Sequence, residues 1–200
     1  MRSGSSIWVV PITKNSTSKE SVPMPSAEAL QLMLDKMALH ELVQNYCRAV
    51  DRRDYALLES VYHPDSIDDH SPMFKGSGPE FVRWVPSSVE RFELTQHVIT
   101  SASFVVDGTI AEGECFIVAY HLRKREPQRE TIAHGRYLDR YEKRDGVWRI
   151  LYRKIIYDWS EVRPYDKELF AKISRGSTKA SPDENDPLYT ELKLFKRGVR

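Results

Sequence analysis

The residues best suited to acid–base chemistry lie at two places far apart in the chain. Asp51 follows a long helical pattern, and His97 stands in the segment Thr95-Gln96-His97 at the start of a predicted strand. A carboxylate at the C-terminal end of a helix faces the negative end of the helix dipole and needs a compensating partner. Asp51 could instead be a turn residue or a cap, but Asp54 is better placed to cap the next helix. An imidazole oriented by a carboxylate is a suitable general base near neutral pH, so we expect Asp51 to orient His97.

Other polar side chains are weaker candidates for a site. Tyr46 lies five residues before Asp51, roughly on the inner face of the same helix, where it either packs in the core or donates to a substrate oxygen. His134 and Tyr137 have opposite parity on one predicted strand, so only one of them can point inward. His121 stands next to a basic run near a strand end, and we expect it in solvent.

The run Asp68-Asp69-His70 could bind a metal together with His63. Hard cations need several convergent oxygen ligands, and no second half of such a site is visible, so we predict no metal. His63 precedes a proline and is expected at a helix end. The sequence has no GxSxG, GxGxxG or P-loop motif, and we therefore expect no cofactor.

The elements that must position these residues fall into two groups. Helical spacing predicts a first helix over about 27–50, a second from Asp54 to about Tyr62 and a third from Pro79 to about Phe92. A short strand is expected over Ser66–Asp69, with a loop between it and the third helix. Long strands follow over Thr95–Val106, Thr109–Lys124, Glu130–Lys143 and Val147–Trp159, joined in part by Asp-Gly hairpin turns.

Helices followed by consecutive antiparallel strands predict an α+β fold with the helices on one face of a curved sheet. Such a sheet forms a cone with a pocket inside. We expect the folded domain over residues 27–160. Residues 1–26 are expected to form a disordered or arm-like tail, and residues 161–200 an extension that acts as a lid or an oligomer contact.

Composition narrows the class of partner. The 200 residues include 30 Lys and Arg against 29 Asp and Glu, for a formal net charge of +1. This balance argues against nucleic acid or an anionic membrane as a partner. No apolar run approaches the length of a membrane span, and the two cysteines show no metal or disulfide framework. We expect a cytoplasmic protein that binds a small molecule.

Three segments together resemble the SnoaL-like branch of the nuclear-transport-factor-2-like (NTF2-like) superfamily. They are Tyr46-Cys-Arg-Ala-Val-Asp51-Arg-Arg-Asp54-Tyr, Thr95-Gln96-His97 and Tyr141-Glu-Lys-Arg-Asp145-Gly146-Val147-Trp148. The resemblance covers about residues 28–160. The members of this branch that the chain resembles include scytalone dehydratase, hexachlorocyclohexane dehydrochlorinase and bile-acid 7α-dehydratase. The spacing and flanks of Asp51 and His97 make it moderately specific, whereas the last segment is specific only to the fold.

The resemblance implies a cone of three helices on a strongly curved, mostly antiparallel sheet, and cofactor-free chemistry. The histidine matching His97 abstracts a proton, and the aspartate matching Asp51 orients it. Tyr46 matches a tyrosine near the leaving group or a carbonyl. The second catalytic histidine of scytalone dehydratase falls at Cys115 here, which is a departure. Pocket-lining, substrate-binding positions are predicted at His70, Trp84, Tyr137, Arg153 and Asp69.

We therefore predict a cofactor-independent lyase that acts on a hydrophobic, hydroxylated aromatic or polycyclic substrate, as in aromatic compound catabolism. The elimination is either a dehydration or a C–C cleavage that releases a small aldehyde. Three alternatives stay open: a ketosteroid-isomerase-like enzyme, which would need Asp139 to face inward, a non-catalytic small subunit of an aromatic ring-hydroxylating dioxygenase, and a small-ligand-binding protein. Apolar patches in the flanking segments favour a homo-oligomer, a trimer more than a dimer.

Overall fold

The computed structural model describes residues 24–200, so most of the predicted tail over residues 1–26 lies outside the described residues. The helices are α1 (Ala27–Asp51), α2 (Tyr55–Ser60), α3 (Gly78–Val89), α4 (Lys167–Ile173) and α5 (Pro187–Glu191). The strands are β1 (Tyr62–His70), β2 (Phe74–Ser77), β3 (Phe92–Asp107), β4 (Ile110–Arg123), β5 (Arg129–Arg144) and β6 (Val147–Pro164). No helix of the described part is long and apolar enough to cross a membrane.

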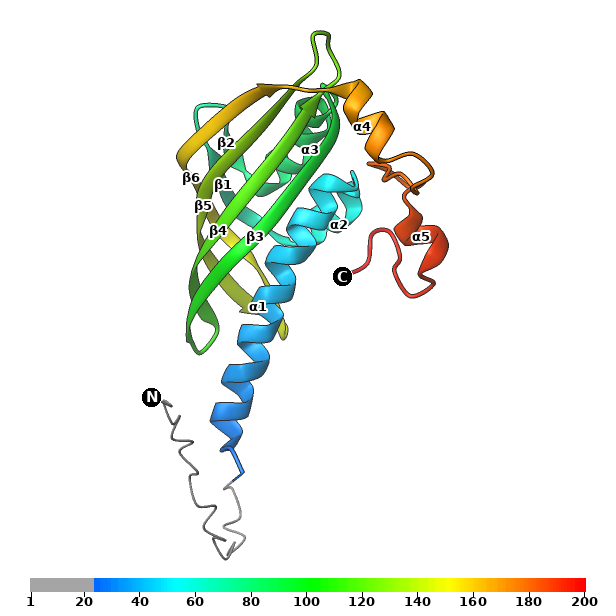
Figure 1. The fold of residues 1–200 in the computed structure, drawn as a ribbon. Coiled ribbons are helices and arrows are strands. Elements are labelled where there is room, and N and C mark those ends of the chain that lie inside the picture. The colour runs from blue at the N-terminus through cyan, green and yellow to red at the C-terminus, as the bar shows by residue number, and fades with distance from the viewer. Residues whose placement is uncertain (1–23) are drawn as a thin grey trace, which may run out of the picture.

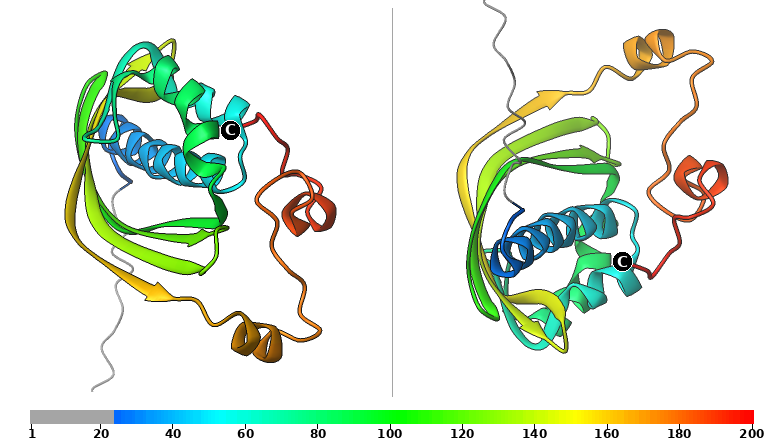
Figure 2. Two further views of the ribbon diagram at one scale, coloured as in Figure 1. Left: turned by 90° about the horizontal axis from the view of Figure 1, so that it is seen from above. Right: turned by 90° about the horizontal axis from the view of Figure 1, so that it is seen from below.

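The six strands form one strongly curved sheet in the order β2-β1-β6-β5-β4-β3 (Figure 1). Helix α1 lies in the concave face of this sheet, and the sheet does not close into a barrel (Figure 2). The predicted α+β class is confirmed. The sheet is not wholly antiparallel, however, because β1 pairs with β6 in parallel. The sequence pattern also missed β2, which pairs with β1 across the predicted loop.

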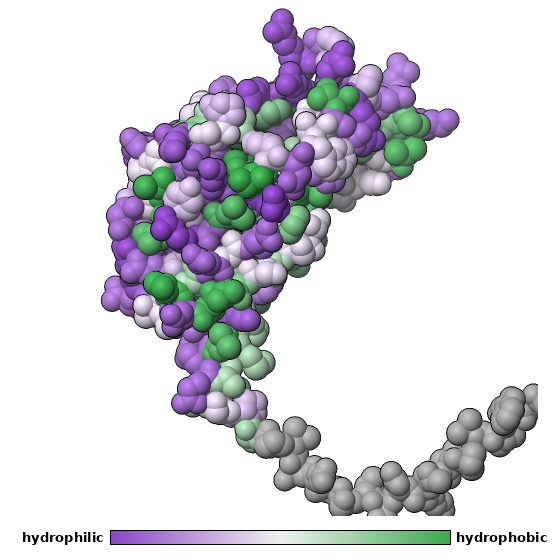
Figure 3. Space-filling model, turned by 90° about the vertical axis from the view of Figure 1, so that its left-hand side faces the viewer, coloured by the Kyte–Doolittle hydropathy of each residue, from purple (hydrophilic) through white to green (hydrophobic). Residues whose placement is uncertain are grey.

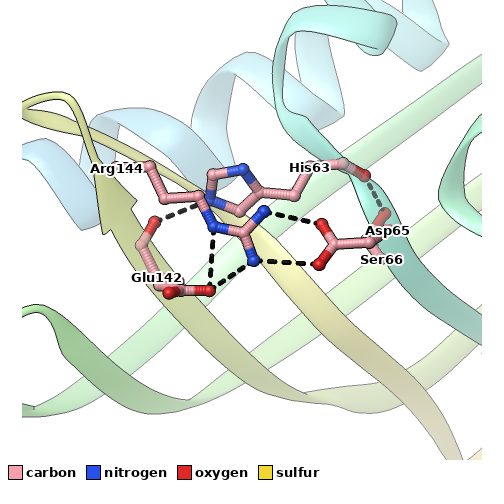
Figure 4. A network of polar contacts seen from close by, with 5 residues as sticks. All are labelled: His63, Asp65, Ser66, Glu142 and Arg144. Carbon is pink, nitrogen blue, oxygen red and sulfur yellow. Dashed lines mark hydrogen bonds and ion pairs between the residues drawn. The ribbon is translucent and has the colours of Figure 1, made fainter.

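Strand β1 begins earlier than predicted, and α2 ends earlier. His63 is therefore a strand residue rather than the end of a helix, and its Nε2 lies 2.9 Å from the carbonyl oxygen of Glu142 on β5 (Figure 4). Arg144 bridges the same region, donating to both oxygens of Asp65 at 2.7 and 3.0 Å and to Glu142 at 2.6 Å. These contacts hold the start of β1 beside the last hairpin.

Helix α1 has two different halves. Ser26 caps its N-terminus by accepting from the amide of Ala29 at 3.2 Å. The second half is buried against the sheet, where it carries Leu39, Leu42, Val43, Tyr46, Cys47, Ala49 and Val50. The first half projects from the body as a stem (Figure 1). Several of its apolar side chains are exposed: Leu30, Leu32, Met33, Leu34 and Met37. Apolar side chains also lie among polar ones on the flank of the body above this stem (Figure 3).

The C-terminal segment returns to the corner between α1 and α2. Arg197 donates to the carbonyl oxygens of Arg52 and Arg53 at 3.0 and 2.8 Å. The amide of Gly198 donates to both oxygens of Asp54, which also caps α2 through the amide of Leu57. The chain end therefore braces the turn that follows Asp51.

Candidate active site

The concave face of the sheet encloses a cavity of about 350 Å³, within the range of small-molecule sites. It is lined from α1, α3 and all the long strands, and much of the lining is apolar. The apolar lining residues include Val50, Phe81, Trp84, Val85, Val89, Phe92, Ile117 and Ile155. Four histidines also border it: His70, His97, His121 and His134. No lining residue comes from the part of the chain beyond Ser160.

Asp51 and His97 meet at one wall of this cavity. The imidazole Nδ1 of His97 lies 2.7 Å from Oδ1 of Asp51. The backbone amide of His97 donates to Oδ2 at 2.7 Å, and the hydroxyl of Thr95 donates to Oδ1 at 2.9 Å. Since an ionised carboxylate only accepts hydrogen bonds, the hydrogen of the imidazole bond sits on Nδ1. The remaining nitrogen, Nε2, is therefore the unprotonated one when the ring is neutral.

The charge on Asp51 is stabilised despite its burial. Burial raises the pKa of this carboxyl, but the charge of His97 and the three hydrogen bonds from His97 and Thr95 outweigh that effect, and the pKa falls below its usual value. The same bonds compensate the unfavourable position of Asp51 at the C-terminal end of α1. Asp51 is thus a fixed anion beside the imidazole.

His121 borders the cavity, so the prediction that it lies in solvent was wrong. It is half-buried, and its ring meets that of His97 edge to face, with the centroids 5.3 Å apart. Burial, and then the nearby charge of His97, lowers the pKa of His121 to about 3. His121 is therefore neutral at ordinary pH and can hydrogen-bond a ligand without carrying charge. The signal available in the sequence was parity, since His121 shares one strand face with Ile117 and Ala119.

Three of the predicted lining residues besides Tyr46 border the cavity: His70, Trp84 and Tyr137. Burial raises the pKa of Tyr46 and of Tyr137 far above the usual value, so both phenols keep their protons. They can only donate from those hydroxyls to an anionic oxygen. Both β5 residues of opposite parity border the cavity, contrary to the expectation that only one would point inward. A register shift between His134 and Gly135 interrupts the strand alternation between them. Tyr137 is buried, and His134 stacks on the exposed ring of Trp159, with the centroids 3.9 Å apart.

Arg153 and Asp69 do not line the cavity. Arg153 is fully buried behind Tyr46 and Tyr137, with its guanidinium carbon 4.1 and 4.0 Å from the two ring centroids. It donates twice to Asp139, at 2.8 and 2.6 Å. Asp69 instead pairs with Lys75 of β2 at 3.1 Å. Both residues support the cavity wall rather than a ligand.

The comparisons with known proteins agree with this architecture. The sequence matches the SnoaL-like domain over residues 31–154. An uncharacterized protein of Mycobacterium tuberculosis is 23% identical over 121 residues, covering 60% of this chain and 82% of that protein. Among solved structures, a hexachlorocyclohexane dehydrochlorinase, LinA-type3 from Novosphingobium barchaimii, has a TM-score of 0.62 at 20% identity and covers 67% of this chain and 93% of its own.

A nuclear transport factor 2-like protein from Salmonella enterica has a TM-score of 0.58 at 16% identity, covering 68% of this chain and 95% of that one. At such identities the solved structures establish a shared fold, and the chemistry has to be argued from this chain's own residues. The match to the domain, in contrast, spans more than half of the chain. The SnoaL-like resemblance expected from the sequence is confirmed: this protein belongs to the SnoaL-like family, and it shares its fold with the NTF2-like protein from Salmonella enterica.

Proposed function

We propose that this protein is a cofactor-independent lyase that eliminates water or a small aldehyde from a hydrophobic, hydroxylated aromatic or polycyclic molecule. The observation that carries the proposal is the 2.7 Å contact between Asp51 and Nδ1 of His97 at the wall of an apolar cavity. This contact leaves Nε2 of His97 as the proton acceptor. A positioned base of this kind contributes about 10²–10⁴-fold to the rate.

In a dehydration, His97 takes a proton from the carbon next to the one that bears the hydroxyl. In a C–C cleavage, it takes the proton from a hydroxyl, whose oxygen forms the C=O bond of the aldehyde as the adjacent C–C bond breaks. The electron pair of that bond stays on the carbon left behind, which takes the proton back from His97. Asp51 stabilises the imidazolium that forms in either case. The apolar lining keeps water from the reacting atoms and strengthens these electrostatic interactions.

Tyr46 is proposed to donate a hydrogen bond to the leaving oxygen or to a developing oxyanion. Its raised pKa supports this role, because a phenol that keeps its proton is a donor throughout the working pH range. The neutral ring of His121 beside His97 is suited to orient a substrate oxygen. Trp84 supplies a flat apolar surface for an aromatic ring.

The geometry is less favourable for an isomerase of the ketosteroid type. That reaction would need a carboxylate base, and Asp139 was the candidate. Both oxygens of Asp139 already accept hydrogen bonds from Arg153, and one also accepts from the hydroxyl of Tyr141 at 2.5 Å. Asp139 is not among the residues that line the cavity. A purely structural subunit would have no use for an oriented imidazole at the cavity wall, and a binding protein would keep its function without His97 as a base.

The test is a screen of hydroxylated aromatics and steroids with the purified full-length chain, read by mass spectrometry for loss of water or of an aldehyde. His97→Ala should abolish turnover of any active compound while its binding, measured by calorimetry, stays within a few-fold. His40→Ala is the matched control, because His40 is an exposed histidine of α1 outside the cavity lining. Unchanged turnover in His97→Ala would rule out the proposed base.

A further inference from the structure

A second carboxylate–imidazole pair borders the same cavity. On β1, Nδ1 of His70 contacts Oδ1 of Asp68, and the hydroxyl of Tyr62 donates to Oδ2 of Asp68 at 2.6 Å. All three side chains are buried, with Asp68 completely inaccessible to solvent. An ionised carboxylate at such depth is stable only when its oxygens are bonded, and here each oxygen has one partner.

The imidazole of His70 has one nitrogen left for a ligand. Its ring stacks on Phe81 of α3, with the centroids 4.7 Å apart, and lies 6.3 Å from the ring of Tyr137 on β5. Because Asp68 occupies Nδ1, Nε2 is the nitrogen available to a molecule in the cavity. Tyr62 and Asp68 act on that molecule only through His70 and are therefore positioning residues.

The two pairs lie on different walls. His97 belongs to β3 and His70 to β1, and the order β2-β1-β6-β5-β4-β3 places three strands between them. Both histidines nevertheless border one cavity, together with Trp84 and Tyr137. A molecule bound in this cavity therefore has both imidazoles in the wall around it.

We propose that His70 is the general acid of the elimination and that it protonates the leaving hydroxyl while His97 takes the proton from carbon. This inference rests on the proposed lyase function. The C–H bond breaks, its proton goes to Nε2 of His97, and its electron pair forms the C=C bond. The C–O bond breaks, and the oxygen keeps that pair, takes a proton from Nε2 of His70 and leaves as water. Exchange of protons with solvent then restores the neutral ring of His97 and the protonated ring of His70.

The proposal narrows the substrate class to alcohols. Hydroxide is a poor leaving group unless it is protonated, whereas chloride leaves without a proton. An enzyme with a dedicated acid opposite its base is therefore built for dehydration more than for loss of halide.

The first experiment needs no substrate. Histidine rings are followed by ¹⁵N NMR in the full-length chain, with His70→Gln and His97→Gln for assignment. Asp68→Asn should move the ¹⁵N resonances of His70 while those of His97 stay in place, because Asp68 contacts Nδ1 of His70 and Asp51 contacts Nδ1 of His97. The charged or titratable groups around His70 are Asp68 and Tyr62 of β1 and Tyr137 of β5; α3 presents the apolar ring of Phe81. His70 resonances that do not respond to Asp68→Asn would overturn the pairing on which the proposal rests.

The second experiment compares two leaving groups on one carbon skeleton. The probes are 4-hydroxy-4-phenylbutan-2-one and its 4-chloro analogue, which give the same conjugated product with a strong ultraviolet band. His70→Gln should lower kcat for the alcohol by about 10²–10⁴-fold and leave the chloride within about threefold. Equal losses on both probes would assign His70 a merely structural role.

The matched control is Asp65→Asn on the same strand, since Asp65 is exposed and pairs with Arg144 outside the cavity. It should leave both rates unchanged. If Asp68→Asn does not fold, Tyr62→Phe tests the contacts from Tyr62 through Asp68 to His70. This variant should lower kcat for the alcohol by less than His70→Gln does and leave kcat for the chloride unchanged. If the wild-type chain converts neither probe, the lyase function fails for this compound class, whereas the response of the His70 resonances to Asp68→Asn tests the pairing separately.

Discussion

The two carboxylate–histidine pairs of the cavity are assembled in opposite ways. Asp51 and His97 are 46 residues apart and meet because the end of α1 packs against β3. Asp68 and His70 are two residues apart on one face of β1. The first pair therefore depends on the position of a whole helix, whereas the second needs only the geometry of a strand. A change that shifts the end of α1 should disturb one pair and spare the other.

Breaking the long-range pair should have the largest effect. Asp51→Asn keeps the shape of the side chain but removes the anion, so His97 can adopt the wrong tautomer and its imidazolium loses its partner. We expect kcat for an active alcohol to fall by up to about 10⁴-fold, with little change in substrate binding. In ¹⁵N spectra the hydrogen should leave Nδ1 of His97 in this variant. A variant that keeps the wild-type rate would show that Asp51 has only a structural role.

The buried pair behind Tyr46 and Tyr137 supports the cavity wall between the two dyads. Replacing one partner, as in Asp139→Asn, leaves Arg153 buried with an uncompensated charge. Loss of one member of a buried ion pair costs about 3–5 kcal/mol, which should appear in the free energy of unfolding measured in urea. The double variant Asp139→Leu/Arg153→Met should recover much of that loss. If the double variant is as unstable as the single one, the cost comes from packing rather than from charge.

The fold was largely predictable because its signals are local. Asp145 and Gly146 adopt positive φ values of 50° and 78°, as a tight hairpin turn requires, and the dipeptide marks that turn in the sequence. The strands on both sides of this turn, β5 and β6, are predicted by the alternation of apolar and polar residues. Strand β2 was missed because a four-residue strand that contains Gly76 has no pattern of its own and exists through its pairing with β1. The parallel pairing of β1 with β6 is a tertiary arrangement that no local pattern encodes.

The candidate site was predictable only in part. The closeness of Asp51 and His97 could be anticipated from their resemblance to a known family, and their catalytic role stays a proposal. The prediction for His121 was wrong because the basic residues after it suggested solvent, whereas strand alternation places it with Ile117 and Ala119 in the cavity lining. The sequence did not predict the partnership of Asp68 with His70 and Tyr62, because Tyr62 was placed at the end of a helix and Asp68 and His70 were considered together only as metal ligands. Tyr62, Asp68 and His70 meet because they share one face of β1, and this face is known only once the bounds of the strand are known.

The ring of His121 meets that of His97, so its titration bears on the pair of Asp51 and His97. Its pKa is lowered from 6.5 to about 3 in the folded chain, so between these values the unfolded state binds more protons than the folded state. Folding stability should therefore fall as the pH drops through this window, with a contribution of at most about 1.4 kcal/mol per pH unit. His121→Gln should remove that contribution and flatten the urea-unfolding curve against pH. Above pH 7 both proteins should show parallel curves, and a difference in slope there would contradict the assignment.

The smallest effect should come from the chain end that braces α1. Deleting residues 197–200 removes the bonds from Arg197 to the carbonyls of Arg52 and Arg53 and from Gly198 to Asp54. We expect a loss of about 1–2 kcal/mol in unfolding free energy, since each of these part-buried bonds contributes about 0.5 kcal/mol net, at the low end of the usual range. Val199→Ala is the control, because it keeps every backbone contact of this segment. The ¹⁵N resonances of His97 should move in the deletion while those of His70 stay in place, because β1 does not depend on the corner that the chain end holds. Equal movement of both histidines would mean that the two pairs are coupled through the cavity wall and do not respond separately.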